Sequence, residues 1–298
     1  MHEDMVRQFG SRAHRDEPMS RHTTFRIGGP ANLLVDVGSR DELLCVLRHV
    51  QEHGLALHVI GRGANLLVSD AGVRGVVLRL AGDFKQASWD EKRNIAKVGA
   101  GVALATLVTD SARRGYDSFC WAVGIPGTIG GAVCCNAGAW GHAMGKFVEA
   151  VHVMTPGGEE KVLAKDEVTF EYRRSSIGSS DIILDATVKL ERAADGTRET
   201  VDVIAENLRR KRETQPLDLP SAGSIFKNPP ECPAGQLIDH AGCKGMREGD
   251  AVVSPKHANF IVNEGKATAT DVMRLIERVR ERVKGQFGVE LELEIGIV

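Results

Sequence analysis

One stretch near the middle of the chain is poor in charge and rich in small residues, which restricts how its neighbours can fold. Residues 124–139, here called the glycine-rich strip, read Gly-Ile-Pro-Gly-Thr-Ile-Gly-Gly-Ala-Val-Cys-Cys-Asn-Ala-Gly-Ala. Glycine adopts positive φ and lets main-chain N–H groups approach a ligand, and Pro126 fixes a turn where no donor is needed. Such a strip can surround a diphosphate with backbone donors. A tight turn buried for packing explains the same composition equally well.

Composition limits the class of partner. With 298 residues, 42% of them hydrophobic, the chain can bury at least one large core, and two domains are expected. A formal net charge of -2 gives no general attraction to nucleic acid or to an anionic membrane. The N-terminus lacks the apolar core of a signal peptide, and no apolar run is long enough to span a bilayer. These features predict a cytoplasmic protein without nucleic-acid or membrane partners. A monomer is expected separately from them.

The cysteines do not indicate a metal site. Six are present, at positions 45, 120, 134, 135, 232 and 243, with no CxxC pair and no spacing shared with histidines. Buried thiols in a reducing compartment are the favoured interpretation. A vicinal disulfide between Cys134 and Cys135 is disfavoured because such bonds are strained.

Hydrophobic spacing predicts a mixed arrangement of strands and helices after an irregular lead-in over residues 1–20. Ser39 marks a helix start, and a capping box at Thr268–Asp271 starts a long helix near the C-terminus. Turn chemistry at residues 193–196 marks a boundary. Expected strands cover 33–37, 57–60, 75–80, 95–98, 182–190, 259–262 and 289–295, with a hairpin at 152–163 and helices from 39, 104, 201, 236 and 268.

Two further glycine pairs suggest nucleotide binding but do not fit a Rossmann fold. Gly61-Arg62-Gly63 follows an expected strand, and a second pair follows at residues 99–101. The dinucleotide fingerprint needs a third glycine, and Leu66 and Leu104 occupy those positions. The sequence therefore disfavours a Rossmann domain.

Three polar groupings are candidates for chemistry. Arg173 and Arg174 follow an aromatic residue and suit a clamp for a carboxylate or phosphate, although the sequence does not choose between them or exclude a surface pair. Ser224 lies among turn formers, where serine usually makes a local hydrogen bond, and no G-x-S-x-G motif is present. Glu290, Glu292 and Glu294 alternate with apolar residues and suit a solvated strand edge.

Five segments in fixed order carry a resemblance that covers nearly all of the chain beyond residue 20. Their sequences are similar to those of the UDP-N-acetylenolpyruvoylglucosamine reductase family. The short interval from Arg173 to Ser224 resembles the branch that lacks an extra tyrosine-bearing loop. The segments are residues 22–31, 61–68, 124–132, 172–175 and 221–229.

The resemblance implies an α+β fold with a vanillyl-alcohol-oxidase-type FAD-binding region of two subdomains and a C-terminal α+β substrate-binding domain. The implied division is a lead-in at 1–20, FAD subdomains at 21–80 and 81–195, and the substrate domain at 196–298, whose last strand returns to the FAD region. FAD is expected to be noncovalent. Backbone donors would surround its diphosphate. The implied cofactor-binding residues are Gly61, Arg62, Gly63, Ala64, Asn65, Leu66, Gly124, Ile125, Pro126, Gly127, Thr128, Gly130, Gly131 and Ala132.

The implied reaction passes a hydride from NADPH through the flavin to the vinyl carbon of the enolpyruvyl ether of a UDP-amino sugar. By the same resemblance, Arg173 and Glu294 stabilise the enol-like intermediate, and Ser224 donates a proton to the ether-bearing carbon. Glu294 is expected to be protonated or hydrogen-bonded, because a bare carboxylate would repel the developing charge. Lys227 and Asn228 are the expected substrate contacts, and no metal is expected.

The sequence departs from the family pattern at several positions. Ala64 replaces a usual serine, Trp140 a common tyrosine, and Cys134-Cys135 a place where methionine is frequent. The choice of Glu294 over Glu292 depends on the spacing from Leu291. Two alternatives stay open: another flavoprotein oxidase or dehydrogenase of the same fold, and a non-catalytic nucleotide-sugar-binding module.

Overall fold

The computed structural model describes residues 2–178, 180–194 and 197–298, which form two compact units. Unit 1 contains residues 1–15, 33–61 and 75–209, and unit 2 contains residues 16–32, 62–74 and 210–298. Each unit has its own hydrophobic core. None of the described helices is long and apolar enough to cross a membrane. The chain thus leaves unit 1 and returns to it twice before the C-terminal third.

A four-stranded sheet follows the expected strand–helix–strand pattern. The helix expected from Ser39 forms with that serine as its N-cap, because the Ser39 side chain accepts a hydrogen bond from the Glu42 N–H. The strand order is β1 (Ala13–Pro18), β2 (Pro30–Val37), β5 (Val73–Leu80) and β3 (Leu57–Ile60), with α2 (Arg40–Glu52) between β2 and β3.

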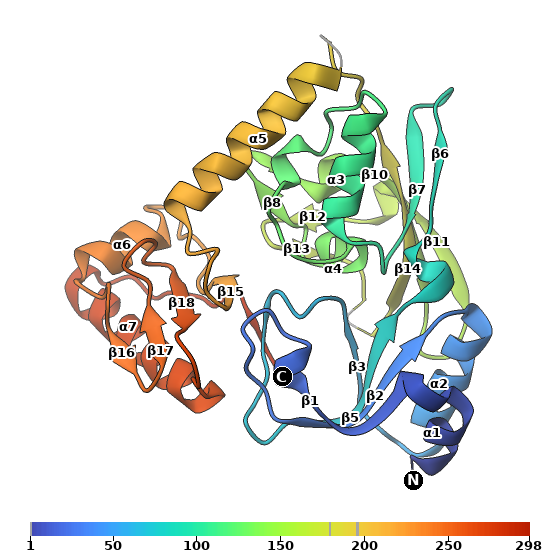
Figure 1. Ribbon diagram of the computed structural model, residues 1–298, viewed down its shortest axis with the longest axis horizontal. Coiled ribbons are helices and arrows are strands. Elements are labelled where there is room, and N and C mark those ends of the chain that lie inside the picture. The colour runs from blue at the N-terminus through green and yellow to red at the C-terminus, as the bar shows by residue number, and fades with distance from the viewer. Residues whose placement is uncertain (1, 179, 195–196) are drawn as a thin grey trace. The chain divides into compact units, whose positions relative to one another are not determined.

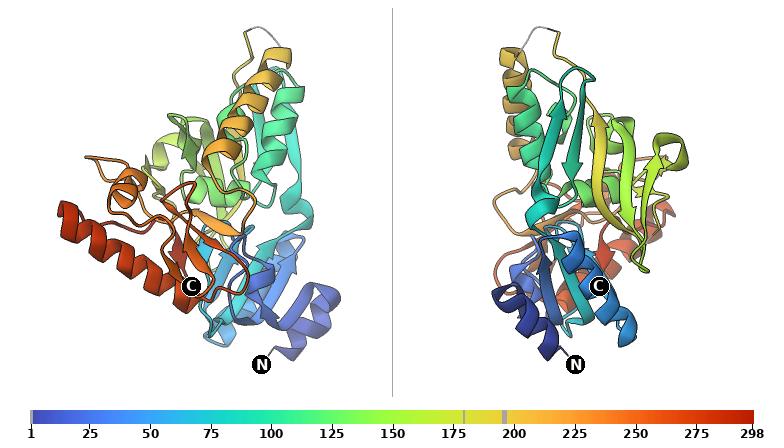
Figure 2. Two further views of the ribbon diagram at one scale, coloured as in Figure 1. Left: turned by 60° about the vertical axis from the view of Figure 1, so that its left-hand side comes forward. Right: turned by 90° about the vertical axis from the view of Figure 1, so that its right-hand side faces the viewer.

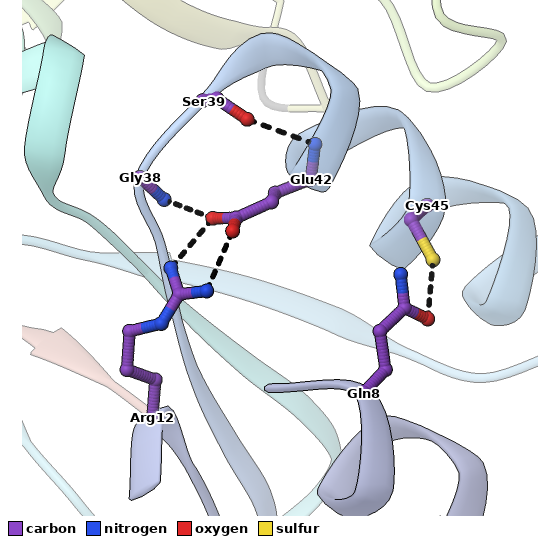
Figure 3. Close-up of polar contacts among 6 residues, drawn as sticks. All are labelled: Gln8, Arg12, Gly38, Ser39, Glu42 and Cys45. Atoms are coloured by element: carbon purple, nitrogen blue, oxygen red, sulfur yellow. Dashed lines mark hydrogen bonds and ion pairs between the residues drawn. The ribbon is translucent and has the colours of Figure 1, made fainter. Parts of the chain in front are cut away.

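The prediction that residues 1–20 are irregular was wrong. Residues 3–9 form α1 (Glu3–Phe9), and β1 joins the sheet. Arg12 binds both carboxylate oxygens of Glu42 at 2.7 and 2.5 Å, and the Gly38 N–H donates to the same carboxylate at 2.6 Å (Figure 3). Met5 and Phe9 enter the core. Long-range partners therefore order a segment whose local sequence is polar.

A five-stranded sheet forms the rest of unit 1, with its strands all antiparallel to their neighbours. Helix α3 (Leu104–Arg113) lies to one side of it (Figure 2). Helix α4 (Ile129–Cys134) packs on β14 and β7. The strand order is β11 (Glu160–Ala164), β10 (Val148–Met154), β14 (Ile182–Lys189), β7 (Ile95–Gly99) and β6 (Ala87–Asp90).

Small elements complete this part of the chain. Among the described residues, two short antiparallel hairpins have strands of two residues each. One pairs β8 (Gly138–Ala139) with β9 (His142–Ala143), and the other pairs β12 (Phe170–Glu171) with β13 (Arg174–Ser175). Helix α5 (Thr197–Thr214) begins earlier than the expected residue 201. The turn predicted at residues 193–196 lies partly outside the described residues.

The last third of unit 2 packs a sheet against the long helix that the capping box predicted. Thr268 caps α7 (Ala269–Phe287), and Asp271 returns the hydrogen bond. Figure 1 shows α7 beside β16 and β17. The sheet order is β15 (Ser221–Ser224), β18 (Phe260–Asn263), β17 (Ala251–Val253) and β16 (Arg247–Glu248), with α6 (Ala234–His240) against α7.

The strand predicted at 289–295 was wrong. Leu293 makes only an isolated bridge to Phe226, and the pairing strand is β19 (Gly296–Ile297), which runs parallel to β4 (Leu66–Leu67). Leu291 and Ile295 are nevertheless buried, and Glu292 is exposed. The alternating pattern therefore predicted which residues are buried and which are exposed. The segment packs its apolar side chains into the core of unit 2 instead of pairing along a sheet edge.

Candidate functional site

The glycine-rich strip combines a turn with one short helix. Thr128 caps α4 by accepting a hydrogen bond from the Gly131 N–H at 3.5 Å. Ile129 and Val133 are buried, whereas Gly131 is exposed. The helix was not predicted, because adjacent glycines are poor helix formers. One side of the strip is therefore anchored in the core while the glycines remain at the surface.

The strip and the first glycine of the Gly61 pair lie against each other within unit 1. A Cβ on Gly61 would lie 2.4 Å from Thr128 Oγ1, so no other residue fits there without movement. Gly127 has φ +147 and open space around its Cβ position. Of the described residues, none accepts a hydrogen bond from the backbone N–H of Gly127 or Thr128. Unpaired donors beside open space fit the phosphate groups of FAD.

Gly63 is a glycine for a different reason. Its Cβ would lie 2.3 Å from the His22 carbonyl oxygen, and its own carbonyl accepts a hydrogen bond from the Thr24 N–H at 3.2 Å. Its φ of +59 also favours glycine. Packing against residues 22–24 thus accounts for Gly63, and its role in cofactor binding stays a prediction.

The loop after Gly63 is fastened to the C-terminal segment of unit 2. The Asn65 side-chain amide donates to the Glu294 carbonyl at 2.9 Å, and the Asn65 carbonyl accepts from the Gly296 N–H at 2.8 Å. Leu66 and Leu67 then pair with residues 296–297. Arg62 is exposed, and Ala64 is half-buried. Asn65 therefore positions Glu294, in addition to its predicted cofactor role.

Ser224 ends β15 just after an irregularity in the strand. The pairing of β15 with β18 shifts between Ser221 and Ser224, and Gly223 has φ +79. A bulge of this kind redirects the side chain that follows it. Ser224 is half-buried. The glycine before the serine is thus required by backbone geometry.

The structure joins the backbone segments that carry Ser224 and Glu294. The Glu294 N–H donates to the carbonyl of Ile225, the residue after Ser224, at 2.8 Å. On the other side, buried Asn259 receives the Phe226 N–H at 2.9 Å and donates to the Phe226 carbonyl at 2.8 Å. We call residues 224–226, Asn259 and Glu294 the Ser224 corner. Its two candidate catalytic side chains are attached to backbone fixed from both sides.

Lys227 and Asn228 have protein partners next to the Ser224 corner. Lys227 Nζ lies 3.2 Å from Glu292 Oε2, and the backbone N–H of Lys227 donates a hydrogen bond to the Glu292 carbonyl. Asn228 Oδ1 accepts from the Ala234 N–H at 3.0 Å, at the start of α6. Both side chains thus make interactions within the protein that explain why these residue types occur here, and their contact with substrate stays a prediction.

Arg173 lies at the tip of the β12–β13 hairpin, in unit 1. Its φ is +59, unusual for a residue with a side chain, and its guanidinium carbon lies 4.9 Å from the centre of the Tyr172 ring. Arg174 belongs to β13 and is exposed. Strained backbone concentrates at functional sites, so the conformation favours Arg173 over Arg174.

The Arg173 hairpin is tied to the end of the glycine-rich strip. Ser175 Oγ donates to the Cys134 carbonyl at 2.9 Å, and Asn136 Nδ2 donates to the Glu171 carbonyl at 2.7 Å. Figure 1 shows β13 beside α4. Asn136 also accepts the Gly145 N–H at 2.9 Å. The structure therefore joins Arg173 to the strip in unit 1 and joins Ser224 to Glu294 in unit 2.

Asn136, Asn259 and Asp70 hold the segments that carry the candidate groups, and none of the three was predicted from the sequence. Asn136 follows the two cysteines and adopts positive φ, a conformation that asparagine tolerates, so its place in a turn was the available signal. Asn259 had no local signal. Its partners are 33 residues away.

Asp70 holds the segment 62–74 against α7 within unit 2. It accepts hydrogen bonds from the Ala269 N–H, the Thr270 N–H and Thr270 Oγ1 at 2.7, 2.9 and 2.7 Å. Burial raises the pKa of Asp70, but these hydrogen bonds outweigh burial and leave the pKa below its ordinary value. A negative charge at the start of a helix is also favourable.

Comparison with known proteins gives consistent results along the chain. Residues 215–298 match the family described as "UDP-N-acetylenolpyruvoylglucosamine reductase, C-terminal domain", and residues 31–164 match "FAD binding domain". The chain is similar to "UDP-N-acetylenolpyruvoylglucosamine reductase 2" of Symbiobacterium thermophilum, at 46% identity over 96% of this chain and 92% of that protein.

Two further relatives agree with these matches. The reductase of the same name from Moorella thermoacetica is 45% identical over 95% of this chain and 92% of its own. The crystal structure of the Thermus caldophilus UDP-N-acetylenolpyruvylglucosamine reductase has a TM-score of 0.83 and 39% identity, covering 96% of this chain and 98% of that one. An α+β fold with an FAD-binding region and a C-terminal domain is thus confirmed.

Proposed function

Because the chain belongs to the UDP-N-acetylenolpyruvoylglucosamine reductase family, we propose that it reduces the enolpyruvyl ether of UDP-N-acetylglucosamine to UDP-N-acetylmuramate. FAD is the bound cofactor and NADPH the reductant, and the reaction belongs to peptidoglycan precursor synthesis. The similarity over 96% of the chain is the observation that carries this function. The Ser224 corner supports it, since it joins two of the three expected catalytic groups.

The product differs from the substrate by a hydride on the terminal vinyl carbon and a proton on the ether-bearing carbon. Bound FAD supplies the hydride chemistry, which no side chain provides. The strip and Gly61 would hold its phosphates through backbone N–H groups, together with the residues of the loop at 62–66. The vanillyl-alcohol-oxidase-type subdomains at 21–80 and 81–195, and the substrate domain at 196–298, are part of this proposal.

Ser224 supplies the proton in the proposed reaction. A hydroxyl is a weak acid near neutral pH, so it requires an acceptor with carbanion character and a nearby positive charge for the alkoxide. Lys227, three residues later, with its Nζ 3.2 Å from Glu292 Oε2, is the cation proposed for that purpose. Backbone bonds at Ile225 and Phe226 limit the movement of the Ser224 backbone.

Arg173 and Glu294 stabilise the charge that develops beside the substrate carboxylate. The guanidinium of Arg173 presents two parallel donors to a carboxylate or enolate. Glu294 contributes as a hydrogen-bonded or protonated acid, since an unpaired anion would oppose the reaction. Asn228 is the further proposed substrate contact. The enzyme acts on these small molecules as a cytoplasmic monomer.

An anaerobic spectroscopic titration tests the function. The purified protein should show flavin absorbance bands that bleach with NADPH and return when the enolpyruvyl substrate is added. Return only with oxygen would identify an oxidase of the same fold. Absence of flavin bands, with UDP-sugar binding intact, would identify a non-catalytic module. Either result would overturn the reductase proposal.

A further inference from the structure

Two adjacent thiols end α4 inside the glycine-rich strip. Cys134 is the last residue of the helix, and Cys135 is its C-cap with φ -88 and ψ 4. All six cysteines of the chain are free thiols. Cys134 is exposed and Cys135 is half-buried. This is the only place in the sequence where two cysteines are neighbours.

The two thiols belong to consecutive residues at the C-terminal end of one short helix. A side-chain hydrogen bond from Cys135 lowers the pKa of Cys134 to about 7, against the opposing effect of burial. A thiolate that accepts a hydrogen bond from a second thiol is stabilised in the way that makes cysteines reactive and able to bind metals. Two sulfur donors therefore occupy consecutive positions, with Cys134 exposed and Cys135 half-buried.

The other four cysteines offer single or buried sulfurs. Cys45 donates to Gln8 Oε1 at 3.1 Å (Figure 3), and Cys232 interacts with Gln236 Oε1 at 3.4 Å. Burial raises the pKa of Cys120 to about 11 and also raises that of Cys243. Neither of the first two has a neighbouring thiol in sequence, so they serve as matched single-thiol controls.

We propose that Cys134 and Cys135 form a chelating dithiol site for trivalent arsenic compounds. Soft thiolate ligands select soft, thiophilic centres. With an arsenoxide, R–As=O, the two S–H bonds break, two As–S bonds form, and the oxygen leaves with both protons as water. No oxidant or reductant is consumed. After the first As–S bond forms, the second is intramolecular, which favours the dithiol over any single thiol.

The position of the dithiol links it to the Arg173 hairpin. The Cys134 carbonyl accepts the hydrogen bond from Ser175 Oγ, and Asn136, next to Cys135, holds Glu171. An arsenic atom bridging both sulfurs would thus lie at residues 134–136, which hydrogen-bond to the Arg173 hairpin. The binding itself does not depend on the proposed reaction, because it requires only the two thiols.

The test is titration of the purified, reduced full-length protein with phenylarsine oxide, followed by intact mass measurement. We expect one phenylarsine group per chain that survives washing with excess 2-mercaptoethanol and is released by 2,3-dimercaptopropanol. Cys134→Ser and Cys135→Ser should each weaken retention by about 100-fold or more. Circular dichroism of each variant checks that it is folded.

Cys45→Ser and Cys232→Ser are the controls and should retain the adduct fully. Retention in both Cys134→Ser and Cys135→Ser would overturn the proposal, because the arsenical would then be bound elsewhere. Loss of the wild-type adduct in the monothiol wash would overturn it too, since that result means binding through one sulfur.

Discussion

The glycine-rich strip and the Ser224 corner position ligands by opposite means. In the strip, the candidate ligand groups are the backbone N–H groups of Gly127 and Thr128, for which no acceptor is found among the described residues. The glycines matter there because they lack a side chain: Gly127 has open space at its Cβ position, and a Cβ at Gly61 would meet Thr128. In the Ser224 corner, the chemistry belongs to side chains, and the backbone beneath them is held by Asn259 and by the Glu294 N–H. The strip therefore depends on local conformation, whereas the corner depends on distant partners.

This difference predicts how each region fails. A substitution at Gly61 adds atoms against Thr128, and one at Gly127 places a side chain on backbone with φ +147, so each should reduce cofactor retention before it changes the chemistry. A substitution in the Ser224 corner removes a group or releases its support, so it should spare the cofactor and impair one step. Separate measurement of the two half-reactions distinguishes these outcomes.

Ser224→Ala should have the largest effect. Loss of the proton donor is expected to slow reoxidation by substrate by about 10²- to 10⁴-fold while leaving flavin reduction by NADPH nearly intact. Stopped-flow absorbance measures both halves. Ser221→Ala, in the same strand, is the matched control and should react normally. Equal loss in both half-reactions would refute the proton-donor assignment.

Arg173→Ala should slow the substrate half-reaction by about 10²- to 10³-fold, because a preorganised donor to the developing negative charge is removed. Arg174→Ala changes the neighbouring exposed arginine and should leave the rate unchanged. The comparison uses kcat from steady-state assays at saturating substrate. A larger loss in Arg174→Ala would show that the positive φ of Arg173 does not mark the functional residue.

Asn259→Ala should destabilise unit 2 by about 2–4 kcal/mol, since it leaves the Phe226 N–H and carbonyl buried without partners. Urea unfolding measures the change. Asn136→Gly, which keeps positive φ, should instead loosen the Arg173 hairpin in unit 1. An unchanged unfolding free energy for Asn259→Ala would contradict this role, because the Phe226 N–H and carbonyl would then not depend on the Asn259 side chain.

Asp70→Asn should have the smallest effect, about 1 kcal/mol at pH 7. The folded-state pKa of Asp70 lies below its ordinary value of 3.8. Its stabilising contribution is therefore present above that value and is lost as the pH falls through the folded pKa. The difference in unfolding free energy between wild type and Asp70→Asn should shrink below about pH 4. Asp218→Asn, at an exposed loop position, is the control and should leave the unfolding free energy at pH 7 nearly unchanged.

Much of the secondary structure was predictable because its signals are local. Ser39 and Thr268 cap the helices that they were expected to cap, and the strand at 57–60 has the predicted limits. The errors occurred where long-range contacts decide conformation. The polar segment 1–20 is ordered by Glu42 and core residues, and the segment at 289–295 lacks a partner strand for most of its length.

The family, the cofactor class and the list of candidate residues followed from the sequence, because glycine spacing and short motifs are confined to neighbouring residues. The sequence did not choose between Arg173 and Arg174, nor explain why Gly63 is a glycine. The carbonyl of His22 beside Gly63 explains that glycine, and the positive φ of Arg173 favours Arg173, whose role stays a prediction. The hydrogen bonds that join Glu294 to Ile225 and Asn65 were also found only in the tertiary structure. Hydrogen bonds across such sequence separations form only when the whole unit closes around its core.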